Sequence, residues 1–556
     1  MGAFGEINKR LRGIGVTSVM NGYFIVVYYA ALIAYTLHAF AASFTDLDGK
    51  WSGVTGKEAY DYFLGTIVGS GTVGDDQMPT RLVWQNVIAL AVAWAAVFFA
   101  VAGGVQNEGR ITYVTMGLPI ILLFVFLGRS VTLPGAQDGI KAYIGQWDLS
   151  VLTEQPDVWS TAVSQIFFSI GVTFGIMTAF GSHCEADAPA FTNAVIIALS
   201  NSFYSFIAGF AVFAGLGYLA MIEDTTIDKL AVGGPGLLFG SYPVVLSTLP
   251  GGQHWVRLLF LTLFMLGIDS AFALLEAALT VLKDTRALNR YPKWGISLVL
   301  CVLSFIFGLL YVTDAGFNFL DVVDFYINFI MLFVGFLEAF GAGWIYGVEK
   351  QISNLGPAPV ILYMYGTMAI WSAAAVCWFN LSENAMLIGW MVVLGGYVAM
   401  SILILISLSG AKHNNPERTT GSLLYELVFG NIFDMCDDFS QIVGHLPKWW
   451  GLIIKHVLPP LLLVLFINLA SAKTGEELDK PLFGNYGGYI DWPYQIMGIF
   501  VVALTLAIFV IGVVCPDAYL FMVPAEIEAT SEMEMKKVED EVLSIDIPMP
   551  EQSATP

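Results

Sequence analysis

The sequence predicts an all-α protein that crosses a membrane many times. Of its 556 residues, 57% are hydrophobic and only 12% are charged, about half the charged share of roughly 25% that is typical of soluble domains. About twelve apolar stretches are long enough for a bilayer span, which takes about 20 residues as a helix. These stretches lack the alternating pattern of a membrane barrel, so helices must satisfy the backbone.

The predicted spans follow one another along the chain from the first residues to near residue 515. An even number of spans places both termini on one side, and Lys9, Arg10 and Arg12 before the first span favour the cytoplasm. The sequon Asn380–Ser382 then falls in an outside loop, as a glycan would require. The expected limits are 14–44, 82–104, 111–130, 158–182, 189–222, 255–284, 294–313, 321–348, 359–378, 384–409, 449–471 and 493–515.

Charge and motif content exclude several other classes of function. A net charge of −21 with only 24 Lys and Arg does not suit a nucleic-acid binder. The five cysteines do not form a disulfide scaffold, and the sequence has no phosphate-binding loop of the Walker type. We therefore expect that the protein is not an enzyme and that it binds no cofactor. Residues 523–556 form an acidic tail, which we expect to be flexible and cytoplasmic.

Two carboxylates in the sixth span need an explanation, because charges inside a membrane are costly. Asp269 stands beside Ser270, and Glu276 follows two helical turns later on the same face. A carboxylate next to a hydroxyl suits a small hard cation such as sodium, whose charge would compensate the buried acid. A neighbouring helix could equally hold the carboxylate for a structural reason, and the residues alone leave both interpretations open.

The fourth span contains Gly171 and Gly175 with β-branched residues between them. This spacing indicates either a small-residue packing face or a break that exposes backbone groups to ions and substrate. The flanking aromatic and polar residues favour the break. The loop 233–243 is apolar yet rich in Gly and Pro, so we expect it to dip into the protein.

Several motifs in the same order resemble those of the neurotransmitter:sodium symporter family, the sodium- and chloride-coupled carriers of amino acids and amines. The resemblance covers about residues 8–350 and 424–520. The motifs are Arg12-Gly13-Ile14-Gly15, Tyr28-Tyr29, Val131-Thr132-Leu133-Pro134-Gly135-Ala136, Asp138-Gly139-Ile140, Gln165-Ile166-Phe167-Phe168-Ser169, Gly234-Pro235-Gly236-Leu237, Tyr242-Pro243, Leu266-Gly267-Ile268-Asp269-Ser270 and Gly343-Trp344-Ile345-Tyr346-Gly347.

The resemblance implies a five-plus-five inverted-repeat fold and sodium- and chloride-coupled symport of a small amino-acid-like substrate, most simply a neutral amino acid. It also implies roles for individual residues. The sodium ligands match Leu266, Asp269, Ser270, Ser169 and Asn201. The chloride ligands match Gln165, Ser169, Asn201 and Ser205. The substrate pocket matches Ile25, Tyr29, Phe168, Phe174 and Ser270. The outer and inner gates match Asp324 and Asp284.

Two departures from the family pattern shape the expected domain organisation. The chain starts where the third family helix begins, which leaves the first repeat incomplete, and 359–409 reads as two inserted helices. We expect a transporter core at 1–350, an inserted segment at 351–423, the last two family helices at 424–522 and the tail. The missing helices leave an alternative open, a non-transporting interaction or regulatory protein or a truncated product. We expect the protein to lie in the lipid bilayer of the plasma membrane and to bind no nucleic acid, and the sequence leaves its oligomeric state open.

Overall fold

The computed structural model describes residues 1–74, 77–155, 157–185, 187–230, 233–381, 384–414, 418–474 and 480–524. Nearly all of the predicted acidic tail and Ser382 of the sequon lie outside these residues. Within them, eleven helical segments are long and apolar enough to cross a membrane. They correspond to eleven of the predicted spans, and the remaining one, 158–182, is interrupted. The structure is therefore that of an all-α polytopic membrane protein.

The long segments include both continuous and kinked helices. The continuous ones are α2 (Arg12–Ala42), α4 (Trp84–Ala102), α11 (Ala190–Ile222), α13 (Gly252–Asp284), α14 (Lys293–Gly308), α15 (Gly316–Phe340), α17 (Pro357–Asn380), α18 (Ala385–Asn414) and α23 (Ile496–Val514). Two further spans are kinked and consist of α5 (Val105–Thr115) with α6 (Gly117–Ser130), and α21 (Lys448–Leu452) with α22 (Leu458–Ser471).

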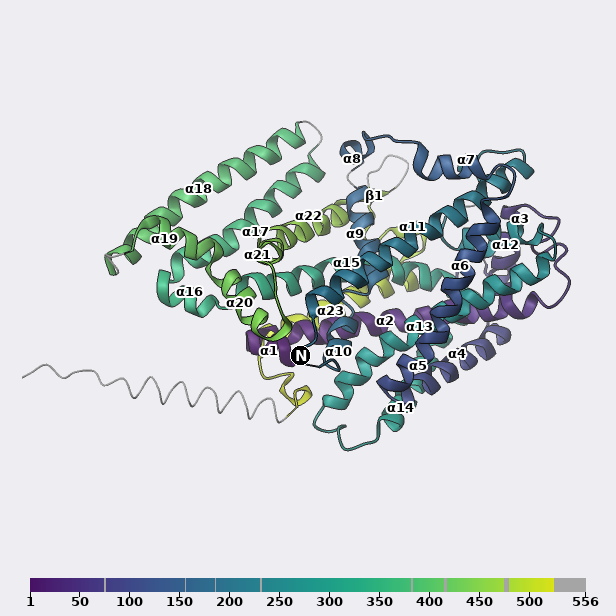
Figure 1. Ribbon diagram of the computed structural model, residues 1–556, viewed down its shortest axis with the longest axis horizontal. Helices are drawn as coiled ribbons and strands as arrows, with labels where there is room; N and C mark the ends of the chain where they lie inside the picture. Colours follow the sequence, from purple (N-terminus) through teal and green to yellow (C-terminus); the bar gives the residue numbers. More distant parts are fainter. Residues whose placement is uncertain are drawn as a thin grey trace, which may run out of the picture.

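Shorter elements connect these spans at the two ends of the molecule and interrupt one of them. The helices are α1 (Gly2–Ile7), α3 (Gly56–Tyr62), α7 (Ala136–Ile140), α8 (Val151–Glu154), α9 (Asp157–Ile170), α10 (Ile176–Gly181), α12 (Tyr242–Ser247), α16 (Val348–Leu355), α19 (Thr420–Tyr425) and α20 (Asn431–Val443). Strands β1 (Lys473–Thr474) and β2 (Lys480–Pro481) pair antiparallel. In Figure 1, α1, α16 and α19 lie towards one end, whereas α3, α7 and α12 lie at the other.

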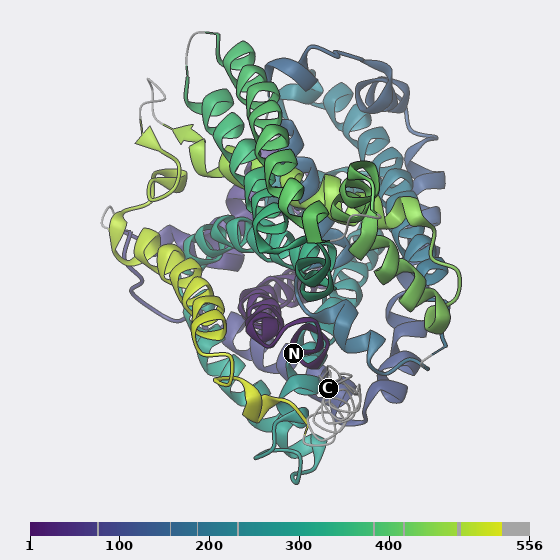
Figure 2. The same cartoon turned by 90° about the vertical axis from the view of Figure 1, so that its left-hand side faces the viewer.

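Helix α2 forms the centre of the core. It packs against α13, α4, α23 and α15, and Figure 2 shows it in purple among the surrounding helices. Ile25, Ala30 and Tyr35 on different sides of α2 are each at most 1% exposed. A helix that is apolar on every side is expected to be buried all round. The neighbouring helices therefore pack around α2.

The loop at 233–243 folds into the protein, as its composition predicts. Gly236–Ser241 form a helical turn that leads directly into α12. Phe239 is 4% exposed, and its carbonyl accepts a hydrogen bond of 2.9 Å from the indole of Trp51. The loop therefore closes one end of the bundle with apolar contacts.

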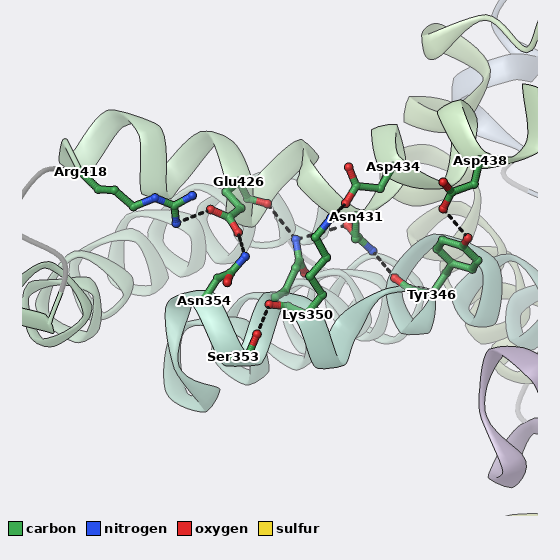
Figure 3. A network of polar contacts seen from close by, with 10 residues as sticks. Tyr346, Lys350, Ser353, Asn354, Arg418, Glu426, Asn431, Asp434 and Asp438 are labelled. Atoms are coloured by element: carbon green, nitrogen blue, oxygen red, sulfur yellow. Dashed lines mark hydrogen bonds and ion pairs between the residues drawn. The ribbon is translucent and has the colours of Figure 1, made fainter. Parts of the chain in front are cut away.

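Helices α17 and α18, inside the segment predicted to be an insertion, pack against each other, and α17 also packs against α22. Polar contacts hold the preceding α16 to the chain that follows the pair (Figure 3). Glu426 accepts from Asn354 at 2.6 Å and pairs with Arg418 at 2.7 Å. Lys350 pairs with Asp434 at 2.6 Å, and this contact raises the pKa of the lysine. The boundaries 351–423 stay a prediction.

Candidate ion and substrate site

The interrupted span places an irregular backbone in the middle of the bundle. Helix α9 ends at Ile170, and α10 begins at Ile176. Between them Gly171, Thr173 and Gly175 have φ values of 76°, 68° and 74°, a left-handed conformation in which a helix cannot continue. The sequence prediction of a break, rather than a continuous packing face, is confirmed.

Helix α2 supports this break directly. The side-chain amide of Asn21 donates to the Thr173 carbonyl at 3.4 Å. A Cβ on Gly22 would lie 2.8 Å from the Phe174 carbonyl, so glycine at this position allows the two backbones to meet. These contacts between α2 and the break hold the carbonyl groups and helix ends of the break near the core, where they can contact an ion or substrate.

The sixth span brings oxygen atoms together on one turn of α13. Ser270 donates to the Leu266 carbonyl at 3.2 Å, and Asp269 lies between these two residues. The hydroxyl of Thr115 on α5 donates to Asp269 Oδ1 at 2.6 Å. Carbonyl, carboxylate and hydroxyl oxygens are the ligands that hard cations prefer. This arrangement is compatible with sodium, and the Thr115 contact also gives the carboxylate a structural partner.

The residues predicted for the first sodium site face each other across two helices. Ser169 near the end of α9 donates to Asn201 Oδ1 on α11 at 3.1 Å, and the Asn201 amide lies 3.0 Å from the Ser169 hydroxyl. Gln165 and Ser205 lie one turn away on the same two helices. Hydroxyl and amide groups can donate to an anion that carries no proton. Ser169, Gln165 and Ser205 are all exposed.

The predicted substrate residues form two contacting pairs around the break. Tyr29 on α2 is hydrogen-bonded to Ser270 on α13. The rings of Phe168 and Phe174 meet edge to face, with centroids 5.8 Å apart. Ile25 is 1% exposed and Phe174 is 2% exposed. The fold thus brings residues from α2, the break and α13 into one region.

The two predicted gate acids have different surroundings. Tyr28 donates a hydrogen bond of 2.6 Å to Asp324 Oδ1, so α2 provides a partner for this acid. Asp324 also lines a cavity of about 370 Å³ with Gln165 and Phe168. Asp284 ends α13 and borders a hollow of about 180 Å³ that also reaches Gly175. The two acids therefore border different cavities, both near the interrupted span.

Three residues at this site were not among the predicted site residues. Thr115 and Tyr28 each donate a hydrogen bond to a predicted site residue, and Asn21 donates to the Thr173 carbonyl in the break. Their signal in the sequence is a polar group on an otherwise apolar helix, which is often only a helix-packing contact. Among the described residues, no group of three or more His, Cys, Asp or Glu side chains could hold a metal ion.

A bundle of membrane-length helices with one interrupted span is an arrangement typical of membrane transporter folds. A sequence profile described as the sodium:neurotransmitter symporter family matches residues 55–408. The chain belongs to this family. It is an integral membrane protein of a transporter family and not an enzyme.

Two relatives show how far the similarity extends. The mouse sodium- and chloride-dependent neutral and basic amino acid transporter B(0+) is 30% identical over 421 residues, which are 66% of this chain and 65% of the relative. The human sodium- and chloride-dependent creatine transporter 1 is 37% identical over 287 residues, 51% of this chain and 45% of the relative. The chain thus spans less than two thirds of one relative and under half of the other.

Proposed function

We propose that this protein carries out sodium-coupled, chloride-dependent symport of a small amino-acid-like substrate by alternating access. The observation that carries the proposal is the single turn of α13 on which the Leu266 carbonyl, Asp269 and Ser270 lie together beside a broken helix. A cation bound there would neutralise an acid inside the membrane, where an isolated charge is expensive. Sodium binding and the shape of the break would then depend on each other.

The second ion set supports coupling to chloride. Ser169 and Asn201 contact each other, with Gln165 and Ser205 one turn away. We assign Ser169 and Asn201 to the first sodium site as well, so the cation and the anion would share neighbouring ligands. Opposite charges held a few ångströms apart stabilise one another, which explains why transport would need both ions.

The substrate region fits a small neutral solute. The two transporter relatives are named for neutral and basic amino acids and for creatine, and we extend the shared amino-acid-like character to this chain. Tyr29 and Ser270 would orient the polar end, and Ile25, Phe168 and Phe174 would surround the rest. None of these five side chains is acidic, so the set favours a substrate without an excess positive charge.

The two gate acids suit opening on opposite sides of the substrate. Asp324 borders the cavity that contains Gln165 and Phe168, and Asp284 borders the hollow at the end of α13. We assign Asp324 to the outer gate and Asp284 to the inner gate. The basic residues near the N-terminus favour cytoplasmic termini. We place the protein in the plasma membrane.

One observation favours a second candidate, a non-transporting membrane interaction or regulatory protein. Gln165, Ser169, Ser205 and Ser270 are exposed in the described structure, whereas ligands of a transported ion are normally enclosed from lipid and bulk water. An exposed set could serve as a surface for another membrane helix, since polar side chains act as contacts between helices.

Uptake by the purified full chain in proteoliposomes distinguishes the two candidates. An inward sodium gradient with chloride present should drive accumulation of radiolabelled neutral amino acids or creatine, and replacing either ion should abolish it. Asp269→Asn serves as the variant with weakened sodium dependence and Asp228→Asn, at an exposed loop position, as the matched control. No uptake by a folded protein would favour the second candidate, and sodium-independent equilibration would contradict sodium coupling.

A further inference from the structure

Glu108, Glu276 and Lys293 form a charged cluster away from the predicted ion ligands. They come from α5, α13 and α14, which meet in the lower part of Figure 1. Lys293 Nζ lies 2.6 Å from Glu276 Oε1 and 3.6 Å from Glu108 Oε1. One ammonium group therefore faces two carboxylates.

The cluster is almost closed to solvent on its acidic side. The side chain of Glu108 is 2% exposed and that of Glu276 is 1% exposed, whereas Lys293 is 25% exposed. Two buried acids with one partner leave an excess negative charge, which is strongly unfavourable in a low-dielectric interior. Something beyond Lys293 must compensate for it.

The hydrogen-bond partners of the two carboxyl groups indicate what could compensate the excess charge. Within the described part of the chain, no donor lies within 3.5 Å of the buried atoms Glu108 Oε1, Glu108 Oε2 and Glu276 Oε2, and Lys293 Nζ approaches Glu108 Oε1 only to 3.6 Å. The two carboxyl groups are nevertheless within hydrogen-bonding range of each other. Ionised carboxylates only accept hydrogen bonds, while a protonated one also donates. A single proton would convert two facing acceptors into a donor and an acceptor.

We propose that Glu108 and Glu276 form a binding site for one proton, which the two carboxyl groups share while Lys293 neutralises the remaining charge. Proton binding turns one carboxylate into a carboxylic acid, and the other stays ionised beside the ammonium group. Two interacting acids titrate as a pair rather than separately. Water is the source of the proton, and it is released to water when the pair loses it.

A hollow borders Glu108. A cavity of about 580 Å³ is lined by Glu108, Thr112, Phe180 and Phe272 among other residues. Thr112 is in turn hydrogen-bonded to Asp269. The proton site thus lies next to the helix face that leads to the predicted sodium ligand, but it does not depend on the proposed transport function.

Other titratable groups near the pair are few. His183 Nε2 lies 4.0 Å from Glu276 Oε1 and 3.3 Å from the Thr280 hydroxyl, and Asp284 interacts with the same imidazole. Lys283 is directed to the carbonyls of Asn289 and Tyr291 instead. Protonated His183 would act on Glu276 through space and would leave the Glu108 oxygens without a donor.

The charged groups on the other packed elements lie away from the pair. Helix α4, which packs on α5 and α14, contains no ionisable acid or base. On α5 itself, Arg110 is exposed, and on α6 the charged residue is Arg129 in the last turn. Tyr23 of α2 is bonded to Ser304 of α14. The proton balance of the cluster is therefore set by Glu108, Glu276, Lys293 and His183.

Infrared difference spectroscopy of the purified full chain in lipid nanodiscs tests this site without measuring transport. Raising the pH should remove a protonated-carboxyl stretching band in the native protein. Glu108→Gln and Glu276→Gln should each abolish that band, because the amide supplies a permanent donor. His183→Gln and the exposed control Glu349→Gln should keep it.

Lys293→Gln adds a second, directional readout. Without the ammonium group the pair should hold its proton more tightly, and the band should persist to a pH about 1 to 3 units higher. Thermal unfolding of Glu108→Gln confirms that this variant is folded. A band that is absent from the native protein, or that survives in both folded glutamine variants, would overturn the proposal.

Discussion

The hydroxyl of Thr115 on α5 donates a 2.6 Å hydrogen bond to Asp269 Oδ1 on α13. This contact ties the one acid of the Leu266–Ser270 turn to a neighbouring span. Threonine supplies a dipole but no charge, so it orients the carboxylate without neutralising it. The remaining negative charge is what a bound cation would compensate.

Asp269→Asn should weaken sodium dependence. The amide keeps the size of the side chain but removes the charge, so the sodium concentration for half-maximal uptake should rise about tenfold or more, equivalent to about 1.4 kcal/mol. Sodium titration of uptake measures the change, with Asp228→Asn as the control. Unchanged sodium affinity would remove Asp269 from the site.

Ser169→Glu should reduce chloride dependence. A fixed carboxylate next to Asn201 would supply the negative charge that chloride otherwise brings to the site. Uptake in chloride and in gluconate buffers is compared, and Ser169→Gln controls for side-chain size. If the glutamate variant needs chloride as strongly as the native protein does, the anion site lies elsewhere.

Tyr28→Phe should destabilise the protein by about 1.5–3 kcal/mol, the range for a hydrogen bond to a charged group. Tyr28 is 1% exposed and donates to Asp324 at 2.6 Å. Tyr35→Phe is the matched comparison, because the equally buried Tyr35 donates to the neutral Tyr311 carbonyl. It should lose only about 0.5–1.5 kcal/mol. Equal losses in denaturant unfolding would show that Asp324 is not ionised in this contact.

Gly175→Ala should disturb the interrupted span. Gly175 has a φ of 74°, where an L-residue costs roughly 1–2 kcal/mol, and an added Cβ would lie 2.8 Å from Val19 Cγ2. Gly128→Ala in α6 is the control, because the added Cβ would meet nothing within 4 Å. This substitution should stabilise the helix by about 0.5–1 kcal/mol. Thermal unfolding in detergent compares them, and equal stability of the two variants would contradict the strained break.

Asp314→Asn should reduce stability at neutral pH and much less in acid. Burial by itself raises the pKa of Asp314, but hydrogen bonds from Thr80, Arg81 and Thr72 outweigh it and lower the pKa overall. These contacts therefore stabilise the fold above about pH 4, and the contribution is lost as the pH falls further. Melting temperatures at pH 7 and below pH 4 measure the effect. A difference that grows in acid would contradict this sign.

The sequence predicted the helical class, the approximate spans and the break between Gly171 and Gly175, because apolar length and glycine spacing are local properties. It also placed Asp269 and Glu276 on one face of a helix. Their different partners, Thr115 for the first and Lys293 for the second, could not be predicted, since they depend on how α5 and α14 pack against α13.

The sequence by itself thus predicted the class, a polytopic membrane protein, and the residue types of its candidate site. The tertiary structure decided which groups meet: Tyr28 with Asp324, Ser169 with Asn201, and Glu108 with Glu276. The physical reason is range. Hydrophobic length and backbone conformation are properties of one continuous segment of about 20 residues or fewer. Hydrogen bonds and charge compensation inside a membrane instead depend on neighbours that only the folded bundle brings within about 3–4 Å.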